Sequence, residues 1–119
     1  MNHIELGKFG EDLASKHLIS KGFELLHRNY RWGKLEIDIV CLHHGKLIIV
    51  EVKTRNSFAL GKPFLAVTLV KQRQIIKVAN QYIVEHQRTE EIRFDVVSIV
   101  HNSKQQEIEH IVDAFYPVV

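Results

Sequence analysis

The stretch from residue 35 to residue 54 constrains the fold of this chain more than any other. It contains two apolar runs rich in β-branched residues, LEIDIVCL and LIIVEVKT, separated by HHGK. Such runs are typical of strands, and the glycine of HHGK permits the left-handed backbone that a tight hairpin needs. The stretch therefore predicts a buried antiparallel hairpin. Each strand nevertheless carries one carboxylate in its middle, Asp38 in the first and Glu51 in the second.

Periodicity assigns most of the remaining chain to regular elements. It predicts a helix over 3–21, a strand over 23–32, a helix from Thr68 to about residue 87, and strands over 92–100 and 107–115. The resulting order is α, β, β, β, α, β, β. This order predicts an α/β protein with a mixed five-stranded sheet flanked by helices. The 119 residues fit one domain, 1–119.

The composition excludes several classes of protein. Hydrophobic residues make up 45% of the chain and charged residues 25%, as in ordinary globular domains. The single cysteine, Cys41, rules out an intramolecular disulfide and suits a reducing cytosol. The first residues include acids that a secretory signal would lack, and no apolar run is long enough to span a membrane. We therefore expect a cytoplasmic protein, and its net charge of +2 is compatible with a polyanionic partner.

The two carboxylates of the hairpin are expected to face each other. A symmetric turn of two or four residues pairs Asp38 with Glu51 and Glu36 with Lys53, whereas a bulge would break this register. Direct cross-strand partners have Cβ atoms about 4.5–5.5 Å apart, where like charges are destabilising, and burial adds a desolvation cost. A divalent cation such as Mg²⁺ or Mn²⁺ would remove the conflict, because it prefers hard oxygen ligands.

Three features favour a metal site over ordinary ion pairs, in which Asp38 would pair with Lys53 or Arg31 and Glu51 would lie in water. Lys53 shares a strand face with Glu51, where its ammonium can contact a phosphate or a water molecule. Glu11 lies on a helix face with small neighbours, which predicts close packing of that helix over the sheet. Basic residues flank the region: Arg28, Arg31, Arg55, Lys62, Lys71, Arg73 and Lys77. Those on the second helix either contact phosphates or form a solvated face.

Six segments, taken in order, resemble one known family. They are GKFGEDLASKHL, EIDIV, IVEVKTR, AVTLVKQRQI, RFDVV and IEHIVDAF, and they extend over nearly the whole chain. The chain resembles the YraN-like family, small bacterial proteins predicted to be endonucleases of the PD-(D/E)xK superfamily and distantly similar to archaeal Holliday junction resolvases. The resemblance implies a restriction-endonuclease-like fold and Mg²⁺-dependent hydrolysis of phosphodiester bonds. DNA is the expected substrate, including branched or junction DNA.

The resemblance also implies roles for individual residues. Asp38, Glu51 and Glu11 would be the metal ligands, with Mg²⁺ as the cofactor and Mn²⁺ able to substitute. Lys53 would complete the catalytic set by orienting a water molecule or stabilising charge on the phosphate. Expected contacts to nucleic acid are Arg31, Arg55, Lys71, Gln72, Arg73 and Lys77, of which Lys71 and Gln72 match basic or amide positions of the family. One departure is that Ile37 stands where the superfamily has proline.

Two functional classes stay open from the sequence alone. The chain is either a metal-dependent nuclease or a nucleic-acid-binding or assembly module that keeps the nuclease fold with little activity. Facing carboxylates favour the nuclease, because in a purely binding protein they would only repel phosphate. A homodimer follows by analogy with resolvases, which cut two strands symmetrically.

Three further residues have two interpretations each. Tyr30 and Trp32 either stack on nucleobases or pack in the core. Asp95 resembles a third catalytic acid, but it shares a strand face with Arg93, and we expect a salt bridge or hydrogen bond within that strand.

Overall fold

The computed structural model describes residues 1–117 of the chain. Its long elements follow the predicted order, with one short 3-10 helix, η1, before the second long helix. The elements are α1 (His3–Ser20), β1 (Glu24–Trp32), β2 (Leu35–His43), β3 (Lys46–Arg55), η1 (Pro63–Ala66), α2 (Leu69–Glu85), β4 (Glu91–His101) and β5 (Gln106–Phe115). The predicted boundaries lie within one or two residues of these.

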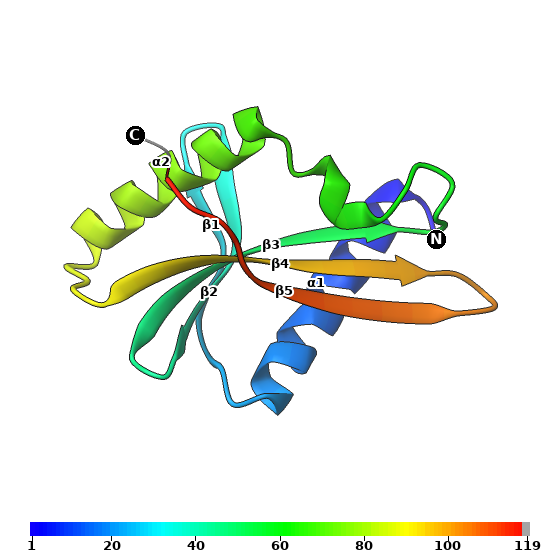
Figure 1. The fold of residues 1–119 in the computed structure, drawn as a ribbon, viewed down its shortest axis with the longest axis horizontal. Helices are drawn as coiled ribbons and strands as arrows, with labels where there is room; N and C mark the ends of the chain where they lie inside the picture. The colour runs from blue at the N-terminus through cyan, green and yellow to red at the C-terminus, as the bar shows by residue number, and fades with distance from the viewer. Residues whose placement is uncertain (118–119) are drawn as a thin grey trace.

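The five strands form one mixed sheet in the order β1-β2-β3-β4-β5 (Figure 1). β3 and β4 run parallel, whereas the other neighbouring strands run antiparallel. Parallel neighbours need a crossover connection, and the segment that contains η1 and α2 provides it. The predicted α/β class, with a mixed five-stranded sheet and a restriction-endonuclease-like order of elements, is confirmed.

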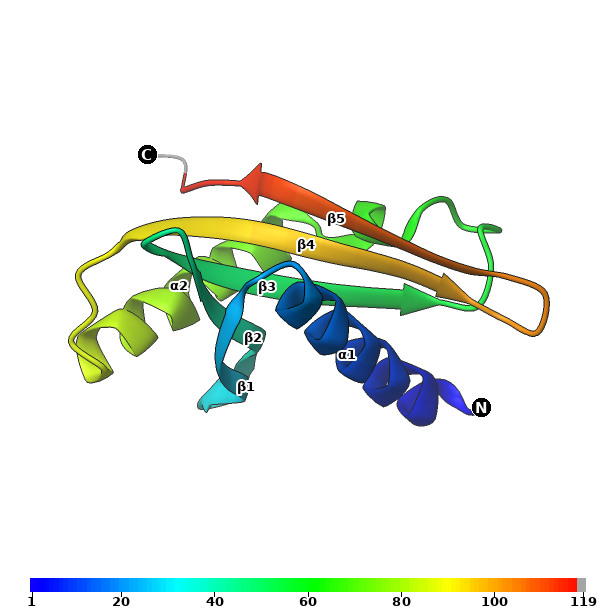
Figure 2. The same cartoon turned by 90° about the horizontal axis from the view of Figure 1, so that it is seen from below.

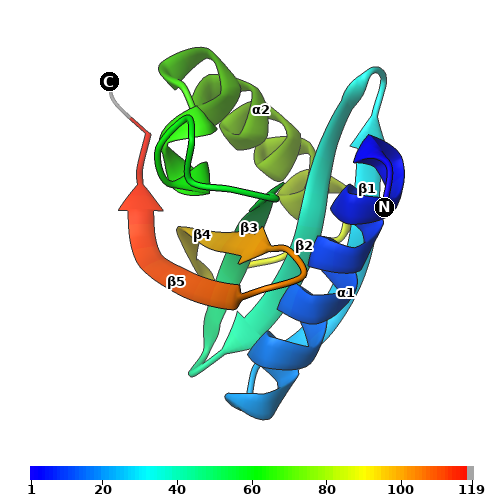
Figure 3. The same cartoon turned by 90° about the vertical axis from the view of Figure 1, so that its right-hand side faces the viewer.

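The two long helices cover opposite faces of the sheet (Figures 2 and 3). α1 packs on a core that contains Ile48 and Val50 of β3. α2 packs on a second core that contains Leu47 and Ile49 of the same strand. β3 is therefore buried on both faces, as expected for a central strand. Among residues 1–117, no helix combines the length and the apolar character needed to cross a membrane.

The hairpin between β2 and β3 turns through His44 and Gly45, whose φ angles of 49° and 75° are both positive. Positive φ at both turn positions is the type I′ geometry, which matches the twist of the flanking strands. The ladder confirms the predicted register over residues 39–43 of β2 and 46–50 of β3. The sequence of the turn thus sets which residues face each other over most of the hairpin.

β2 and β3 separate just beyond this ladder, at Asp38. The pairing ends before Asp38 and Glu51, so the prediction that they are direct cross-strand partners is wrong. Ile37 lies in the core on the α2 side, whereas Ile39 lies in the core on the α1 side. Because residues two apart in a regular strand point to the same side, β2 must rotate sharply across Asp38. Beyond Asp38 the two strands diverge (Figure 1). The space between residues 35–38 of β2 and 51–55 of β3 is called the fork below.

α1 approaches β3 closely at Gly10, beside the small neighbours of Glu11 noted in the sequence. A Cβ atom built on Gly10 would lie 1.8 Å from Oγ1 of Thr54. A Cβ atom on Gly7, one turn earlier, would meet nothing within 4 Å. Gly10 is therefore the position where the absence of a side chain permits the close approach. The next residue, Glu11, is brought to the fork by this approach.

Asp95 of β4 is fully buried and fastens β5 to the sheet. Its carboxylate accepts hydrogen bonds from Nε and Nη2 of Arg93 at 2.8 Å each and from the backbone N–H of Asp113 at 3.0 Å, and Nε2 of His110 lies 2.7 Å away. Burial alone would raise the pKa of Asp95, but the contacts with His110 and Arg93 outweigh it and lower that pKa. The predicted ion pair within the strand is confirmed, and Asp95 serves the fold.

Candidate metal centre and nucleic-acid interface

The fork opens into a cavity of about 570 Å³ between α1, β1, β2 and β3. All four predicted catalytic residues line this cavity, together with two of the predicted nucleic-acid contacts: Glu11, Asp38, Glu51, Lys53, Arg31 and Arg55. The fold thus gathers side chains that are far apart in the sequence around one open space.

Local structure explains how each element presents its side chain. α1 begins with a capping box, in which Asn2 accepts from the backbone N–H of Glu5 at 2.9 Å and the Glu5 carboxylate accepts from that of Asn2 at 3.0 Å. This fixed start places Glu11 in the third turn, beside the close contact with β3. Glu51 and Lys53 are two residues apart in β3, so strand alternation puts both on one face.

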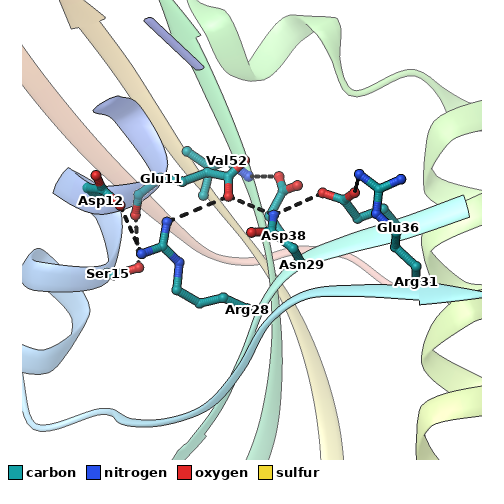
Figure 4. A network of polar contacts seen from close by, with 9 residues as sticks. All are labelled: Glu11, Asp12, Ser15, Arg28, Asn29, Arg31, Glu36, Asp38 and Val52. Carbon is teal, nitrogen blue, oxygen red and sulfur yellow. Dashed lines mark hydrogen bonds and ion pairs between the residues drawn. The ribbon is translucent and has the colours of Figure 1, made fainter. Parts of the chain in front are cut away.

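Asp38 closes the narrow end of the fork. Its Oδ2 accepts a hydrogen bond from the backbone N–H of Val52 at 2.8 Å, which bridges the separated strands (Figure 4). Burial raises the pKa of Asp38, whereas the Val52 N–H lowers it, and a protonated Glu51 carboxyl would lower it further by donating a hydrogen bond. The two carboxyl groups therefore interact directly, although their backbones are not paired.

Glu51 is a buried carboxylate whose negative charge has few stabilising contacts. It is only 4% exposed, and in its ionised form its Oε2 has no hydrogen-bond donor among residues 1–117. Burial and then the neighbouring Asp38 carboxylate raise the pKa of Glu51 to about 8, against the opposing charges of Lys71 and Lys53. A buried carboxylate without a partner is unfavourable, and a cation in the fork would compensate it. Its chemistry therefore fits that of a metal ligand.

Two further carboxylates lie beside that of Asp38. Glu11, Glu36 and Asp38 each offer one oxygen atom, and these three oxygens lie within 4.8 Å of one another. Burial raises the pKa of Glu11, the amide of Asn29 opposes this, and the charges of Asp38 and Glu36 raise it further. Several oxygen ligands around one point are the donor set that Mg²⁺ and Mn²⁺ prefer.

Nitrogen donors lie among these carboxylates (Figure 4). Nδ2 of Asn29 donates to Oε1 of Glu11 at 2.8 Å and to Oε1 of Glu36 at 3.0 Å. Arg28 lies 3.7 Å from Glu11, and Arg31 lies 3.0 Å from Glu36. These donors offset the repulsion among the acids, so the acids and the donors form one coupled network.

Glu36 and Asn29 of this network were not predicted as site residues, and Arg28 was predicted only as a basic residue that flanks the region. The sequence does signal Glu36, because it lies two residues before Asp38, but the predicted register paired it with Lys53, whereas the structure pairs it with Arg31. Asn29 carries no comparable signal. Its φ of 53° is a left-handed conformation, which asparagine tolerates better than most residues, and only the folded chain reveals it.

The residues of α2 that were predicted to contact nucleic acid lie in different environments. The charge of Lys71 lowers the pKa of both Asp38 and Glu51, so Lys71 lies near these acids, although it does not line the cavity. Arg73 and Lys77 are exposed on α2 and form no ion pair among the described residues. They can therefore meet an external anion.

Gln72 has a different environment from the other predicted contacts. Its Nε2 donates to the carbonyl of Val67 at 3.1 Å, beside the start of α2. It lines a small apolar cavity with Phe64 and Phe115 instead of the fork. Its amide thus helps to hold the segment that leads into α2.

Known proteins of one family match this chain over nearly its full length. A family described as "Uncharacterised protein family UPF0102" matches residues 10–99. A UPF0102 protein of Flavobacterium psychrophilum is 42% identical, with 96% of each chain covered. One of Phocaeicola vulgatus is 42% identical over 98% of this chain and 97% of its own, and one of Prosthecochloris aestuarii is 40% identical over 94% of each. The YraN-like assignment is confirmed, and the chain belongs to the UPF0102 family.

Proposed function

We propose that this protein is a metal-dependent nuclease that hydrolyses phosphodiester bonds in DNA, with branched or junction DNA as the preferred form. The observation that carries the proposal is the buried Glu51 carboxylate, whose Oε2 has no hydrogen-bond donor among residues 1–117 and whose charge is repelled by the neighbouring Asp38. A divalent cation between these groups would compensate both burial and repulsion. Mg²⁺ is the proposed cofactor, and Mn²⁺ should substitute because it accepts the same oxygen ligands.

Four carboxylates are available to hold the ion. Asp38 belongs both to the pair with Glu51 and to the group with Glu11 and Glu36, so it is the central ligand of the proposal. A bound ion of this kind would polarise the phosphate and lower the pKa of a water molecule. When the ion binds, the amide of Asn29 would no longer be needed to offset the repulsion between Glu11 and Glu36.

The chain's own cations supply the remaining chemistry. The Lys53 ammonium, in the same cavity, would orient the water molecule or stabilise negative charge on the phosphate oxygens. The water oxygen forms a bond to phosphorus, one P–O ester bond breaks, and the proton released from the water is passed to solvent or to the leaving sugar oxygen. Arg31 and Arg55 would contact the flanking phosphates and fix the register of the strand.

Cleavage assays on linear, flapped and four-way DNAs test this proposal. Wild-type protein should cut at least one of them in Mg²⁺ or Mn²⁺ and none in EDTA. Lys53→Ala should lose about 100-fold or more in rate, because it removes one charge-stabilising group. It should keep its Mn²⁺ affinity in calorimetry, since Lys53 is not a ligand. Lys46→Ala is the matched control, because Lys46 lies at the other end of β3 and contacts Glu91 at 3.9 Å.

Asp38→Asn should instead lose Mn²⁺ binding and cleavage together. Asp113→Asn on β5 is its control, because Asp113 is exposed and has a φ of 55°, which asparagine accepts. A folded wild-type protein that binds DNA but cuts none in either metal would overturn the nuclease and support the binding module. Loss of metal binding in Lys53→Ala would contradict the division of roles between Lys53 and the acids.

A further inference from the structure

Trp32 is exposed at the end of β1, and its strand partner Leu35 lies at the β2 end of the fork. It is 40% exposed, whereas Tyr30, two residues earlier on the same face, is 6% exposed and donates its hydroxyl proton to Glu85. Tyr30 is therefore a core residue, and of the two predicted stacking residues only Trp32 is accessible. Trp32 pairs with Leu35 across a two-residue turn, which leaves its ring at the tip of a hairpin. Single exposed apolar residues are common, so exposure alone assigns no role.

One cation lies against this ring, and two more are close to Trp32 in the sequence. Nζ of Lys77 lies 5.7 Å from the centroid of the Trp32 ring, the side chain of Arg31 is 75% exposed, and the turn residue Lys34 is exposed. An aromatic ring for stacking beside cations for the backbone is the combination that binds single-stranded nucleic acid. A base lying on the Trp32 ring would bring a neighbouring phosphate toward Lys77.

The strand geometry ties Trp32 to the candidate site. Arg31, its neighbour, pairs with Glu36, which belongs to the carboxylate group of the fork. Trp32 lies three residues along β1 from Asn29, which contacts that same group, or about 10 Å at the usual rise of a strand. About three nucleotides of one strand cover this length at the axial spacing of a duplex.

We propose that Trp32 is a stacking platform for an unpaired nucleobase a few nucleotides from the phosphate held in the fork. Bases within a duplex stack on each other and do not present a face to a protein ring, so the substrate must supply an unpaired base there. This names the substrate class of the proposed nuclease, on which the inference rests: a DNA strand that is single or leaves a duplex at a branch. RNA with unpaired bases has the same stacking chemistry, and the test distinguishes the two.

The fluorescence of Trp32, the only tryptophan in the sequence, reports directly on this platform. Labelled oligothymidylate, a ribose strand with the same thymine bases, an abasic strand of equal length and a blunt duplex are each titrated in EDTA and in Mg²⁺. Anisotropy follows binding while Trp32 emission is recorded. The platform requires saturable quenching by strands that carry bases and much less by the abasic strand and the duplex. Stronger quenching by the oligothymidylate supports DNA, and stronger quenching by the ribose strand with the same bases overturns that choice of sugar.

Variants separate stacking from charge. Trp32→Ala should weaken binding of the oligothymidylate roughly 10- to 100-fold and leave the abasic strand and the duplex nearly unchanged. Trp32→Phe keeps an aromatic ring and should retain most of the affinity, which also guards against a folding defect in the alanine variant. Tyr116→Ala, an exposed aromatic residue after β5, is the matched control.

Equal weakening for strands with and without bases in Trp32→Ala would overturn the platform, as would an unquenched Trp32 on a saturated strand or no binding in either condition. The readout needs no cleavage, so it is independent of the nuclease proposal. If the protein is inactive but Trp32 is quenched, the platform is supported and the proposed hydrolysis is overturned. If the protein cleaves DNA but Trp32 emission does not change, the hydrolysis is supported and the platform is overturned.

Discussion

At the scale of single residues, Glu51 links the stability of the fold to pH. Its pKa is raised from 4.5 to about 8 in the folded chain, so the folded state holds a proton between these values that the unfolded state has lost. The stabilisation from this group is therefore complete below the unfolded pKa. It falls by up to about 1.4 kcal/mol per pH unit as pH rises through the window and is lost above the folded pKa.

Glu51→Gln should remove this dependence in the metal-free protein. The amide has nearly the same shape and does not titrate, so the variant should become more stable than the wild type as pH rises, with the difference levelling off above about pH 8. Urea denaturation in EDTA, from about pH 5 to about pH 9, measures it. Glu109→Gln is the control, because Glu109 lies on β5 in an exposed pair with Lys62 at 3.6 Å. Parallel curves for Glu51→Gln and wild type would show that Glu51 ionises normally.

Bound metal should make the wild type more stable than Glu51→Gln, the reverse of their order without metal. Mn²⁺ at a hundred times its dissociation constant stabilises a folded state that binds it by about 2.7 kcal/mol. The wild type should gain this, and more at pH 8 than at pH 6 because the ligands must be deprotonated. Glu51→Gln should gain much less, since an amide is a weaker ligand for a hard cation. Equal shifts of both unfolding curves would place the ion elsewhere.

At the scale of elements, the approach of α1 to β3 positions Glu11, and Gly10 makes that approach possible. Gly10→Ala would put a Cβ atom 1.8 Å from Oγ1 of Thr54, and that residue's own Cβ would lie only 2.9 Å away, so rotation of the threonine side chain cannot relieve the clash. We expect a loss of about 1–3 kcal/mol in unfolding free energy, as for other overpacked sites. Because α1 must move outward, Mn²⁺ affinity should fall as well if Glu11 is a ligand.

Gly7→Ala is the internal control for this change on the same helix. Its Cβ atom would meet nothing within 4 Å, so the variant should gain about 0.5–1 kcal/mol from helix propensity alone. Urea denaturation of both variants, with Mn²⁺ calorimetry, decides the matter. If Gly10→Ala were stabilised as well as Gly7→Ala, α1 would not pack as closely on β3 as described above.

At the scale of the whole molecule, cations on α2 and in the fork offer two surfaces to one polyanion. If Arg73 and Lys77 contact phosphates, their double alanine variant should bind every sequence more weakly. Its slope of log affinity against log salt should then be smaller by about 1 per lost contact. Lys16 and Lys21 are exposed near the other end of α1, away from the fork, and their double alanine variant is the control. Anisotropy titrations at several salt concentrations measure both, and equal slopes in all proteins would assign Arg73 and Lys77 to a solvated face.

The sequence by itself determined the local geometry of this protein. Strand alternation, β-branched composition and the glycine at the hairpin turn are properties of a few adjacent residues, so they set the elements and the register over residues 39–43 and 46–50. Small residues on α1 likewise predicted its close approach to the sheet, and Glu11, Asp38, Glu51 and Lys53 do line one cavity.

Only the tertiary structure decided how the candidate site is assembled. The alternation of β2 breaks at Asp38 because Ile37 packs under α2 while Ile39 packs under α1. Packing in two separate cores causes this break, so the pattern of neighbouring residues could not predict it. That rotation opens the fork, separates Asp38 from backbone pairing with Glu51, and brings Glu36 beside Glu11. The contacts of Asn29 and the closeness of Lys71 to the acids have the same origin, since they join elements distant in sequence through packing on opposite faces of one sheet.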